Sequence, residues 1–301
     1  MTERRERELV LAPNEYAYVL DTTKGHVNCY VGPNKTSLAQ TDQSVRFDHD
    51  SKRFRSVDLD EAVCLFATAP ENWYVVLKNP ARDNVHPSPG VASSLVDLRV
   101  GRKVVVPGPC AFPLWPGQMA RVIRGHRLRA NEYLYVRIYD AEAAGERWHE
   151  ALGQPTPEAP PPFTSGEKRL IKGSDVRFYM PPTGVEVVPD AQGRFVREAI
   201  TLERLEYAIL EGEDGRRRYV RGEAVVFPGP EERAVIRDGR NKHRAIELSR
   251  TTGLHVKVVA PYTDDDGDHA VGEELFLTGD GRIYFPHEAH QIVRQGGRTV
   301  H

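Results

Sequence analysis

The sequence predicts an all-β protein made of about five tandem small antiparallel β modules in an elongated array, with one short helix and a proline-rich connector. The first observation is a period-two alternation of aromatic and β-branched residues, as in residues 16–20 and 133–139, which is typical of half-buried strands. The second is a cassette that recurs five times, in which an alternating run, a polar turn and a glycine are followed seven positions later by another glycine. The glycine pairs are Gly25/Gly32, Gly101/Gly108, Gly166/Gly173, Gly222/Gly229 and Gly272/Gly279.

Each cassette contains two strand-forming runs that are joined by a turn-forming composition. The first runs are residues 15–21, 72–79, 132–140, 205–215 and 253–267, and the second runs are 26–31, 103–107, 168–172, 223–228 and 273–278. A third run stops at proline in residues 176–182 and 281–286 and at Pro-Gly in residues 110–117, where proline removes a ladder donor and closes the strand. Each cassette is therefore expected to form a hairpin or a small antiparallel sheet.

The modules are predicted to differ mainly in their loops. The expected boundaries are residues 1–66, 67–126, 127–189, 190–240 and 241–301. The second module carries a long loop, 80–97, with three prolines and no periodicity, which predicts an extended surface excursion. The third carries an insert, 141–165, that starts as a short helix and continues as a proline-rich connector, for which we expect a partner contact.

Composition narrows the classes of function. The 301 residues have a net charge of −2 from 41 basic and 43 acidic residues, so the chain lacks the basic excess that nucleic-acid binding needs. No apolar run is long enough for a membrane span, and the charged N-terminus predicts no secretory signal. Cys29, Cys64 and Cys110 have no metal-ligand spacing and predict reduced thiols, with an intermolecular disulfide as the alternative.

Four segments contain residue types that could form a catalytic, nucleotide-binding or metal-binding site. The segment HEAH (287–290) departs from the HExxH zinc pattern and is expected to be an exposed link between repeats. The segment TDDDGD (263–268) has Glu273 six residues after its glycine, as in a calcium loop, but strands flank it, so an acidic hairpin turn is expected. The segment GPNKTS (32–37) lacks the order of a phosphate-binding loop, and Arg216–Arg218 next to Glu211, Glu213 and Asp214 predict a salt-bridged turn. We therefore predict no catalytic, cofactor-binding or metal-binding residues, no cofactor, and no enzymatic activity.

The repeats are similar to a known family. Residues 272–293, GEELFLTGDGRIYFPHEAHQIV, resemble the repeat of the major vault protein, and residues 220–236 and 102–140 resemble further copies of it. Short proteins made only of vault-like repeats resemble virion structural proteins of tailed bacteriophages, which wrap the neck or tail. The resemblance implies a structural protein of the neck, collar or tail sheath region, located in the virion after assembly in the host cytoplasm. The alternatives are a bacterial vault-like or stomatin-like scaffold, and a β-repeat carbohydrate-binding or enzymatic protein.

The expected partners are copies of the same chain and other virion structural proteins, with no nucleic acid and no membrane. Tyr16–Leu20 and Ile283–Phe285 are interpreted as strand edges at the two ends of the array. Open edges must be paired or covered, so we expect a cyclic homo-oligomer or stacked rings that form a sleeve.

Overall fold

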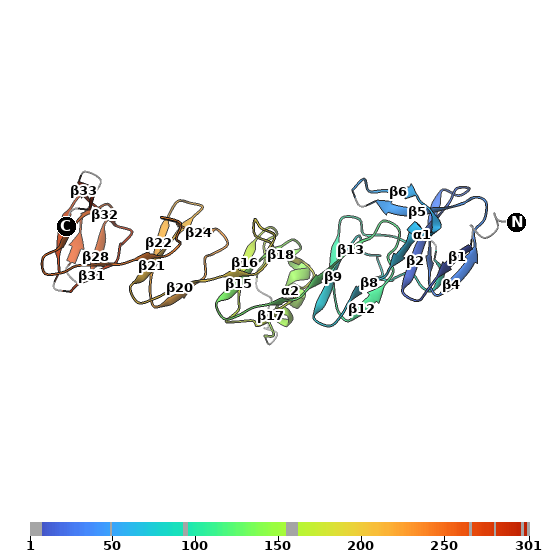
Figure 1. Cartoon of the computed structure of the whole chain (residues 1–301), viewed down its shortest axis with the longest axis horizontal. Coiled ribbons are helices and arrows are strands. Elements are labelled where there is room, and N and C mark those ends of the chain that lie inside the picture. Colours follow the sequence, from blue (N-terminus) through green and yellow to red (C-terminus); the bar gives the residue numbers. More distant parts are fainter. Residues whose placement is uncertain are drawn as a thin grey trace. The chain divides into compact units, whose positions relative to one another are not determined.

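The computed structural model describes residues 8–48, 50–92, 96–154, 162–264, 267–279, 281–295 and 298–299. The chain separates into two compact units, which are described one at a time. The first unit comprises residues 1–127, 137–167 and 178–187, and the second comprises 128–136, 168–177 and 188–301. The protein is mostly β-structure in many small antiparallel sheets, which confirms the predicted fold class (Figure 1).

One topology recurs five times along the chain. A central strand pairs with a hairpin partner on one edge and with a third strand on the other edge. The central strands are β2 (Glu15–Asp21), β9 (Trp73–Lys78), β15 (Glu132–Ile138), β21 (Glu206–Gly212) and β27 (Gly253–Val258). Their hairpin partners are β3 (His26–Val31), β11 (Lys103–Pro107), β16 (Lys168–Lys172), β22 (Arg217–Arg221) and β30 (Glu274–Thr278). The third strands are β5 (Asp42–Asp48), β13 (Met119–Arg124), β18 (Val185–Val188), β24 (Glu232–Ala234) and β32 (His290–Ile292).

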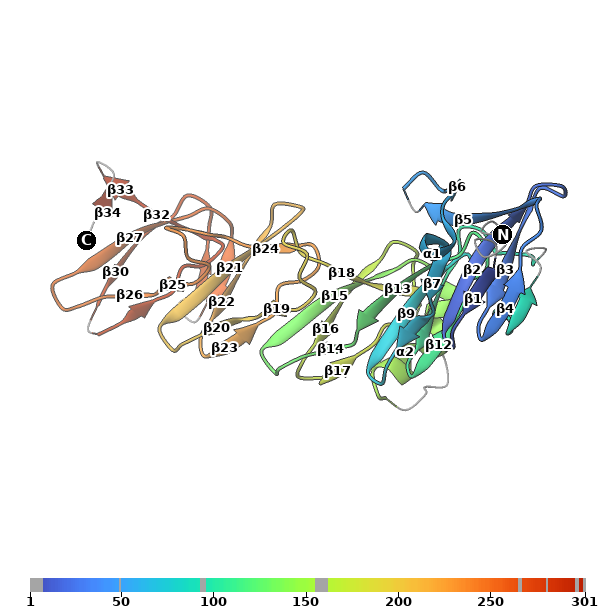
Figure 2. The same ribbon diagram turned by 45° about the vertical axis from the view of Figure 1, so that its right-hand side comes forward.

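A two-stranded ribbon completes each module, because the strand before the central strand pairs with the strand after the hairpin (Figure 2). The ribbons are β1 (Glu8–Leu11) with β4 (Asn34–Ser37), β8 (Ala67–Ala69) with β12 (Cys110–Phe112), β14 (His126–Arg127) with β17 (Phe178–Tyr179), β20 (Ile200–Leu202) with β23 (Ala224–Val226), and β26 (Ile246–Glu247) with β31 (Ile283–Tyr284). This arrangement gives every module the same pair of small sheets.

The remaining strands and helices add to this repeated topology. Three short strands pair with the start of a central strand: β7 (Val63–Leu65), β19 (Arg197–Glu198) and β25 (His243–Arg244). A further strand, β6 (Arg53–Ser56), pairs antiparallel with β5. Two short hairpins are β28 (Tyr262–Asp264) with β29 (Gly267–His269), and β33 (Arg294–Gln295) with β34 (Arg298–Thr299). The helices are α1 (Leu59–Ala62) and α2 (Ala141–Ala151).

The insert after the third central strand begins as predicted. Helix α2 starts at Asp140, whose side chain accepts a hydrogen bond from the backbone N–H of Ala143, as an N-cap does. Trp148 is buried on the helix and packs edge-on against Phe163 with ring centroids 5.1 Å apart. The proline-rich stretch 155–161 lies outside the described residues.

The structure corrects two expectations about the strands, for residues 16–20 and for the loop 80–97. Tyr16–Leu20 do not form an open edge, because β2 is paired on both edges, with β3 on one side and β5 and β7 on the other. Ile283 and Tyr284 form β31, which pairs with β26 in a two-stranded ribbon and keeps its other edge unpaired among the described strands, as expected. The loop 80–97 is not a free excursion, since it contributes β10 (Gly90–Ala92), which adds to the outer edge of β3.

The two faces of each central sheet have different roles. In module 1, Ala17 and Val19 lie two and four residues after Glu15, and they pack with Leu9 and Leu11 of the ribbon. We call this side the ribbon face. Tyr16 and Tyr18 lie on the opposite side, which we call the stacking face, because it packs against the next module.

Candidate functional site: the faces between modules

Each central strand is preceded by a four-residue leading turn. The leading turns are residues 12–15, 70–73, 129–132, 203–206 and 249–252, and in each one the last backbone N–H donates to the first carbonyl. In modules 1, 3 and 4 the turn ends in Glu15, Glu132 or Glu206, whose carboxylate accepts from the first backbone N–H at 2.7–2.9 Å. Thr252 has the same role in module 5. The side chain therefore closes the turn reciprocally and fixes where the central strand begins.

The second glycine of a cassette rests on the leading turn. The backbone N–H of this glycine donates to the carbonyl of the last residue of the turn, at 2.8 Å in Gly32, Gly108, Gly173 and Gly222. A Cβ at these four positions would lie only 1.8–2.2 Å from the carbonyl oxygen of the first residue of the turn. Any larger residue would therefore push the hairpin partner off the turn.

This contact corrects the register of the fourth glycine pair. Gly215, with φ +79°, forms the hairpin turn between β21 and β22, and Gly222 is the glycine that packs on the leading turn. The fourth pair is therefore Gly215/Gly222, and the predicted pair Gly222/Gly229 is wrong by one glycine. Gly229 instead begins the turn before β24, where its N–H donates to Glu232 at 2.7 Å. Glycines at 215, 222 and 229 are equally spaced, so the period alone cannot select the pair.

In two of the modules, a tyrosine of the stacking face donates hydrogen bonds to the following module. Tyr18 donates its hydroxyl to the carbonyls of Leu114 and Trp115, at 2.9 and 3.2 Å. Tyr135, at the same position of its own central strand, donates to the carbonyls of Pro228 and Gly229, both at 3.0 Å. In both cases the acceptors lie at the start of the turn before the third strand, which we call the closing turn. Burial raises the pKa of both phenols, so they remain hydrogen-bond donors.

A cation–π contact is repeated in the second unit. Lys172 lies over the ring of Phe227 at 5.4 Å, and Arg221 lies over the ring of Phe285 at 5.2 Å. Each cation directly precedes a second glycine, and each ring stands two residues before a closing turn. Contacts of this type contribute roughly 0.5–1 kcal/mol at exposed positions. The successive modules therefore meet through equivalent residues.

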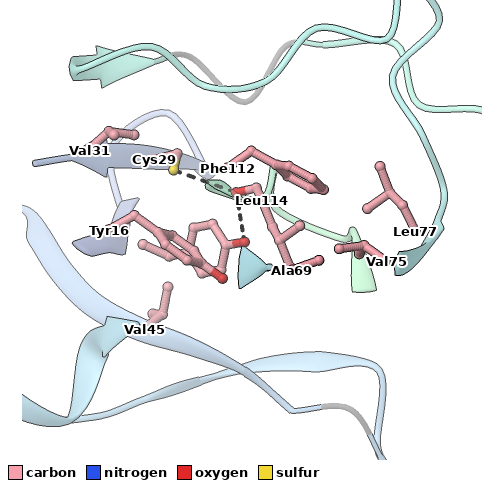
Figure 3. Packing of buried hydrophobic residues seen from close by; sticks show 10 residues of the cluster. Tyr16, Cys29, Val31, Val45, Ala69, Val75, Leu77, Phe112 and Leu114 are labelled. Atoms are coloured by element: carbon pink, nitrogen blue, oxygen red, sulfur yellow. Dashed lines mark hydrogen bonds between the residues drawn. The ribbon is translucent and has the colours of Figure 1, made fainter. Parts of the chain in front are cut away.

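The apolar core between modules 1 and 2 shows what a covered stacking face looks like (Figure 3). Tyr16, Tyr18, Cys29 and Val31 are each at most 5% exposed and pack with the ribbon face of module 2. Leu114 lies in the middle of this cluster, and its carbonyl accepts from Tyr18 and, at 3.6 Å, from the thiol of Cys29.

Burial restricts the chemistry of the cysteines. Burial raises the pKa of the Cys29 thiol to about 12, and Cys29 has no exposed surface, so it is inaccessible to another chain in this fold. Cys64 and Cys110 are half-buried, and burial is also the main cause that raises the pKa of each thiol. All three cysteines are free in the structure.

Modules 2 and 3 share an ion-pair cluster around Glu186. Its carboxylate accepts from Lys103 at 3.0 Å and from the guanidinium of Arg137. Burial acts to raise the pKa of Glu186, but the hydrogen bonds from Arg137 and Lys103 outweigh it, so the pKa is lowered. Thr183 adds a hydrogen bond to the edge of β11, from the N–H of Val105 to its hydroxyl at 3.0 Å.

The two metal candidates fall together in module 5. The segment 263–268 forms the β28–β29 hairpin, as expected, although residues 265 and 266 lie outside the described part. HEAH is not an exposed inter-repeat link: His287 to His290 form the closing turn of module 5, and Ala289 is buried. The hairpin brings Tyr262 against both histidine rings, with centroids 5.2 and 4.8 Å away.

This aromatic cluster is held by hydrogen bonds. His269 bridges Asp264 and Glu273 at 3.1 and 3.2 Å, and these carboxylates raise its pKa against the opposing effect of burial. His290 pairs with the hydroxyl of Tyr284 at 3.1 Å, and burial lowers its pKa. Within the described ranges, no three His, Cys, Asp or Glu side chains are arranged to hold a metal ion.

The other two candidate segments have structural roles. Gly32 of GPNKTS packs on a leading turn, and residues 34–37 form β4. Arg217 pairs with Glu211 at 3.1 Å and Arg216 with Asp214 at 3.4 Å, as the charge pattern predicted. The sequence did not predict that Arg218 pairs with Glu232 across the sheet at 2.8 Å.

A cavity of about 350 Å³ lies beside β11 in the first unit. Its walls are mainly apolar, including Leu77, Val104 and Val106, and its titratable residues are His86 and Arg147. His86 stacks on Phe112 with ring centroids 4.0 Å apart, and burial lowers its pKa. The lining offers no carboxylate to orient His86 as a base.

Comparison with known proteins gives no family for this chain. No protein-family model matches it, and no curated protein is significantly similar to it. Among the described residues, no helix has the length and apolar character needed to cross a membrane.

Proposed function

We propose that this protein is a vault-like repeat protein that self-assembles into a ring or sleeve on a large particle. More specifically, we propose that the protein is a component of the neck, collar or tail region of a tailed-phage virion. The observation that carries it is the repeated use of one sheet face as the contact between successive modules. Tyr18 and Tyr135 make the same bond to the next module, 117 positions apart in the chain.

The distribution of chemistry along the chain supports a mechanical role. The buried hydroxyls, the cation–π pairs and the Glu186 cluster all join one module to the next. Repeat proteins in which each unit contacts its neighbours form extended surfaces suited to binding other macromolecules. The resemblance of the cassettes to vault repeats supports the same role, because vault repeats form the walls of a shell.

The proposal is tested on the purified full-length protein. Mass photometry at micromolar concentration, followed by electron microscopy of negatively stained samples, should show rings or stacked rings. A gene neighbourhood with portal, sheath or tail genes is expected for the virion form of the proposal. A strict monomer at every concentration, also in the presence of purified neck and tail proteins, would contradict it.

A further inference from the structure

Within the described part of the chain, the stacking face of the fifth module is exposed, unlike its counterparts. In this module the central strand and its hairpin partner present three cross-strand pairs on that face: Gly253 with Thr278, His255 with Phe276, and Lys257 with Glu274. Phe276 is 70% exposed, whereas Cys29, the residue at the same register position in module 1, has no exposed surface. A large aromatic side chain exposed to this degree at a position that is elsewhere an interface core indicates an interaction surface.

The exposed ring is held in a fixed orientation. Phe276 stacks on His255 with ring centroids 4.2 Å apart and an angle of 15° between the planes. His255 in turn is bonded through Nε2 to Glu274 at 3.1 Å, and its side chain is only 17% exposed. The outer face of Phe276 is therefore presented flat and with little rotamer freedom left to lose, which favours binding.

We infer that this face of module 5 docks a second copy of the chain, which presents the same face across a two-fold axis. The inference rests on the proposed role in self-assembly and names one of its contacts: a two-fold contact closes on itself, so it joins two subunits or two rings, and the ring itself uses a second contact. A two-fold axis parallel to the strands sets the central strand of one copy over the hairpin partner of the other. Lys257 then faces the partner's Glu274, and Phe276 faces the partner's His255. The surface is thus self-complementary in charge, with an aromatic centre and a polar rim.

Module 1 of a second copy is a less suitable partner for the stacking face of module 5. In modules 2, 4 and 5 the segment before the closing turn, which covers the preceding stacking face, is apolar: Pro113-Leu114, Phe227-Pro228 and Phe285-Pro286. In module 1 the same position is Ser37-Leu38, and Leu38 is already buried in its own module. A head-to-tail contact would therefore lack the apolar pair that covers the stacking faces of the other modules.

The first experiment compares three full-length proteins by sedimentation velocity between 0.1 and 50 µM, a range chosen to span the roughly micromolar affinity of weak dimers. In Phe276→Asp the apparent dissociation constant should rise at least about tenfold, as for loss of a central aromatic anchor. Val271→Asp is the matched control, since Val271 is 63% exposed in the same module but lies in the turn before β30. It should associate like the parent. Hydrogen exchange of module 5 peptides checks that both variants are folded.

Charge reversal provides a second test that leaves the aromatic pair in place. Lys257→Glu makes the face acidic and Glu274→Lys makes it basic, so each variant alone should associate less than the parent. An equimolar mixture should restore association, because an acidic face then meets a basic one.

The outcomes separate this inference from the proposed function. If the parent associates, and Phe276→Asp associates equally well or the charge-reversed mixture gives no restoration, the docking surface is wrong while self-assembly stands. If the parent is monomeric at every concentration, both proposals fail.

Discussion

Gly222→Ala should selectively destabilise the fourth module, because the new methyl group has no room. Its Cβ would lie 1.8 Å from the carbonyl oxygen of Glu203, and normal contact requires a separation larger by more than an ångström. The obstacle is backbone, so neither partner can rotate away. Overpacking a well-packed site costs about 1–3 kcal/mol, and loss of the Gly222 to Glu206 hydrogen bond adds about 1 kcal/mol.

The matched control is Gly229→Ala, which tests the alternative register of the repeat. Its Cβ would lie 3.2 Å from Oε2 of Glu232, a side-chain atom that must give by a few tenths of an ångström against its bonds to Gly229 and Arg218, so the expected effect is about 1 kcal/mol or less. A chain of five modules does not unfold in one step, so the assay must be local. Amide hydrogen exchange followed by mass spectrometry resolves peptides from β21 and β22 separately from the rest.

A loss of about 3 kcal/mol corresponds to a roughly hundredfold faster exchange by local opening in β21 and β22. Peptides from modules 1 and 2 should exchange as in the parent protein. Equal effects of the two substitutions, or a larger effect at Gly229, would refute the assignment of Gly222 to the leading turn.

The remaining predictions concern the contacts between modules and the buried histidine. Tyr135→Phe removes the hydroxyl that bonds two carbonyls and should lower the stability of module 4 by about 1 kcal/mol, measured by the same exchange assay. Burial lowers the pKa of His126 to about 4, whereas in the unfolded chain this imidazole takes up its proton near pH 6.5. Protonation therefore favours the unfolded chain as the pH falls from about 6.5 to 4, and up to about 3 kcal/mol of the stability present above pH 6.5 should be lost. In His126→Asn that part of the pH dependence of local opening around β14, measured by hydrogen exchange corrected for the intrinsic effect of pH, should vanish; an unchanged acid profile would assign it to other groups. Glu186→Gln should cost about 1 kcal/mol at low salt and less at 1 M salt, because the pairs with Lys103 and Arg137 are partly exposed; a salt-independent loss would count against a charge effect.

The sequence by itself determined the local structure of the modules. Alternating runs such as residues 15–21 formed strands at the expected positions, since the pleat sets a period of two that aromatic and β-branched side chains reveal. The helix pattern after Asp140 likewise depended only on local spacing and a capping side chain. The acidic hairpin at 263–268 and the ion pairs of Arg216 and Arg217 followed from composition, because neighbouring opposite charges pair without long-range information.

Only the tertiary structure decided which strands were central and which faces were covered. Alternation in Tyr16–Leu20 does not reveal how many neighbours this strand has, because its pairing with β5 and β7 depends on segments 20–50 residues away. The register of the fourth glycine pair depended on a close approach between Gly222 and Glu203, which no spacing rule contains. The difference between Cys29, which is buried under module 2, and Phe276, which is exposed, is likewise invisible in sequence. Both occupy the same position in the repeat, and burial there depends on the presence of a neighbouring module.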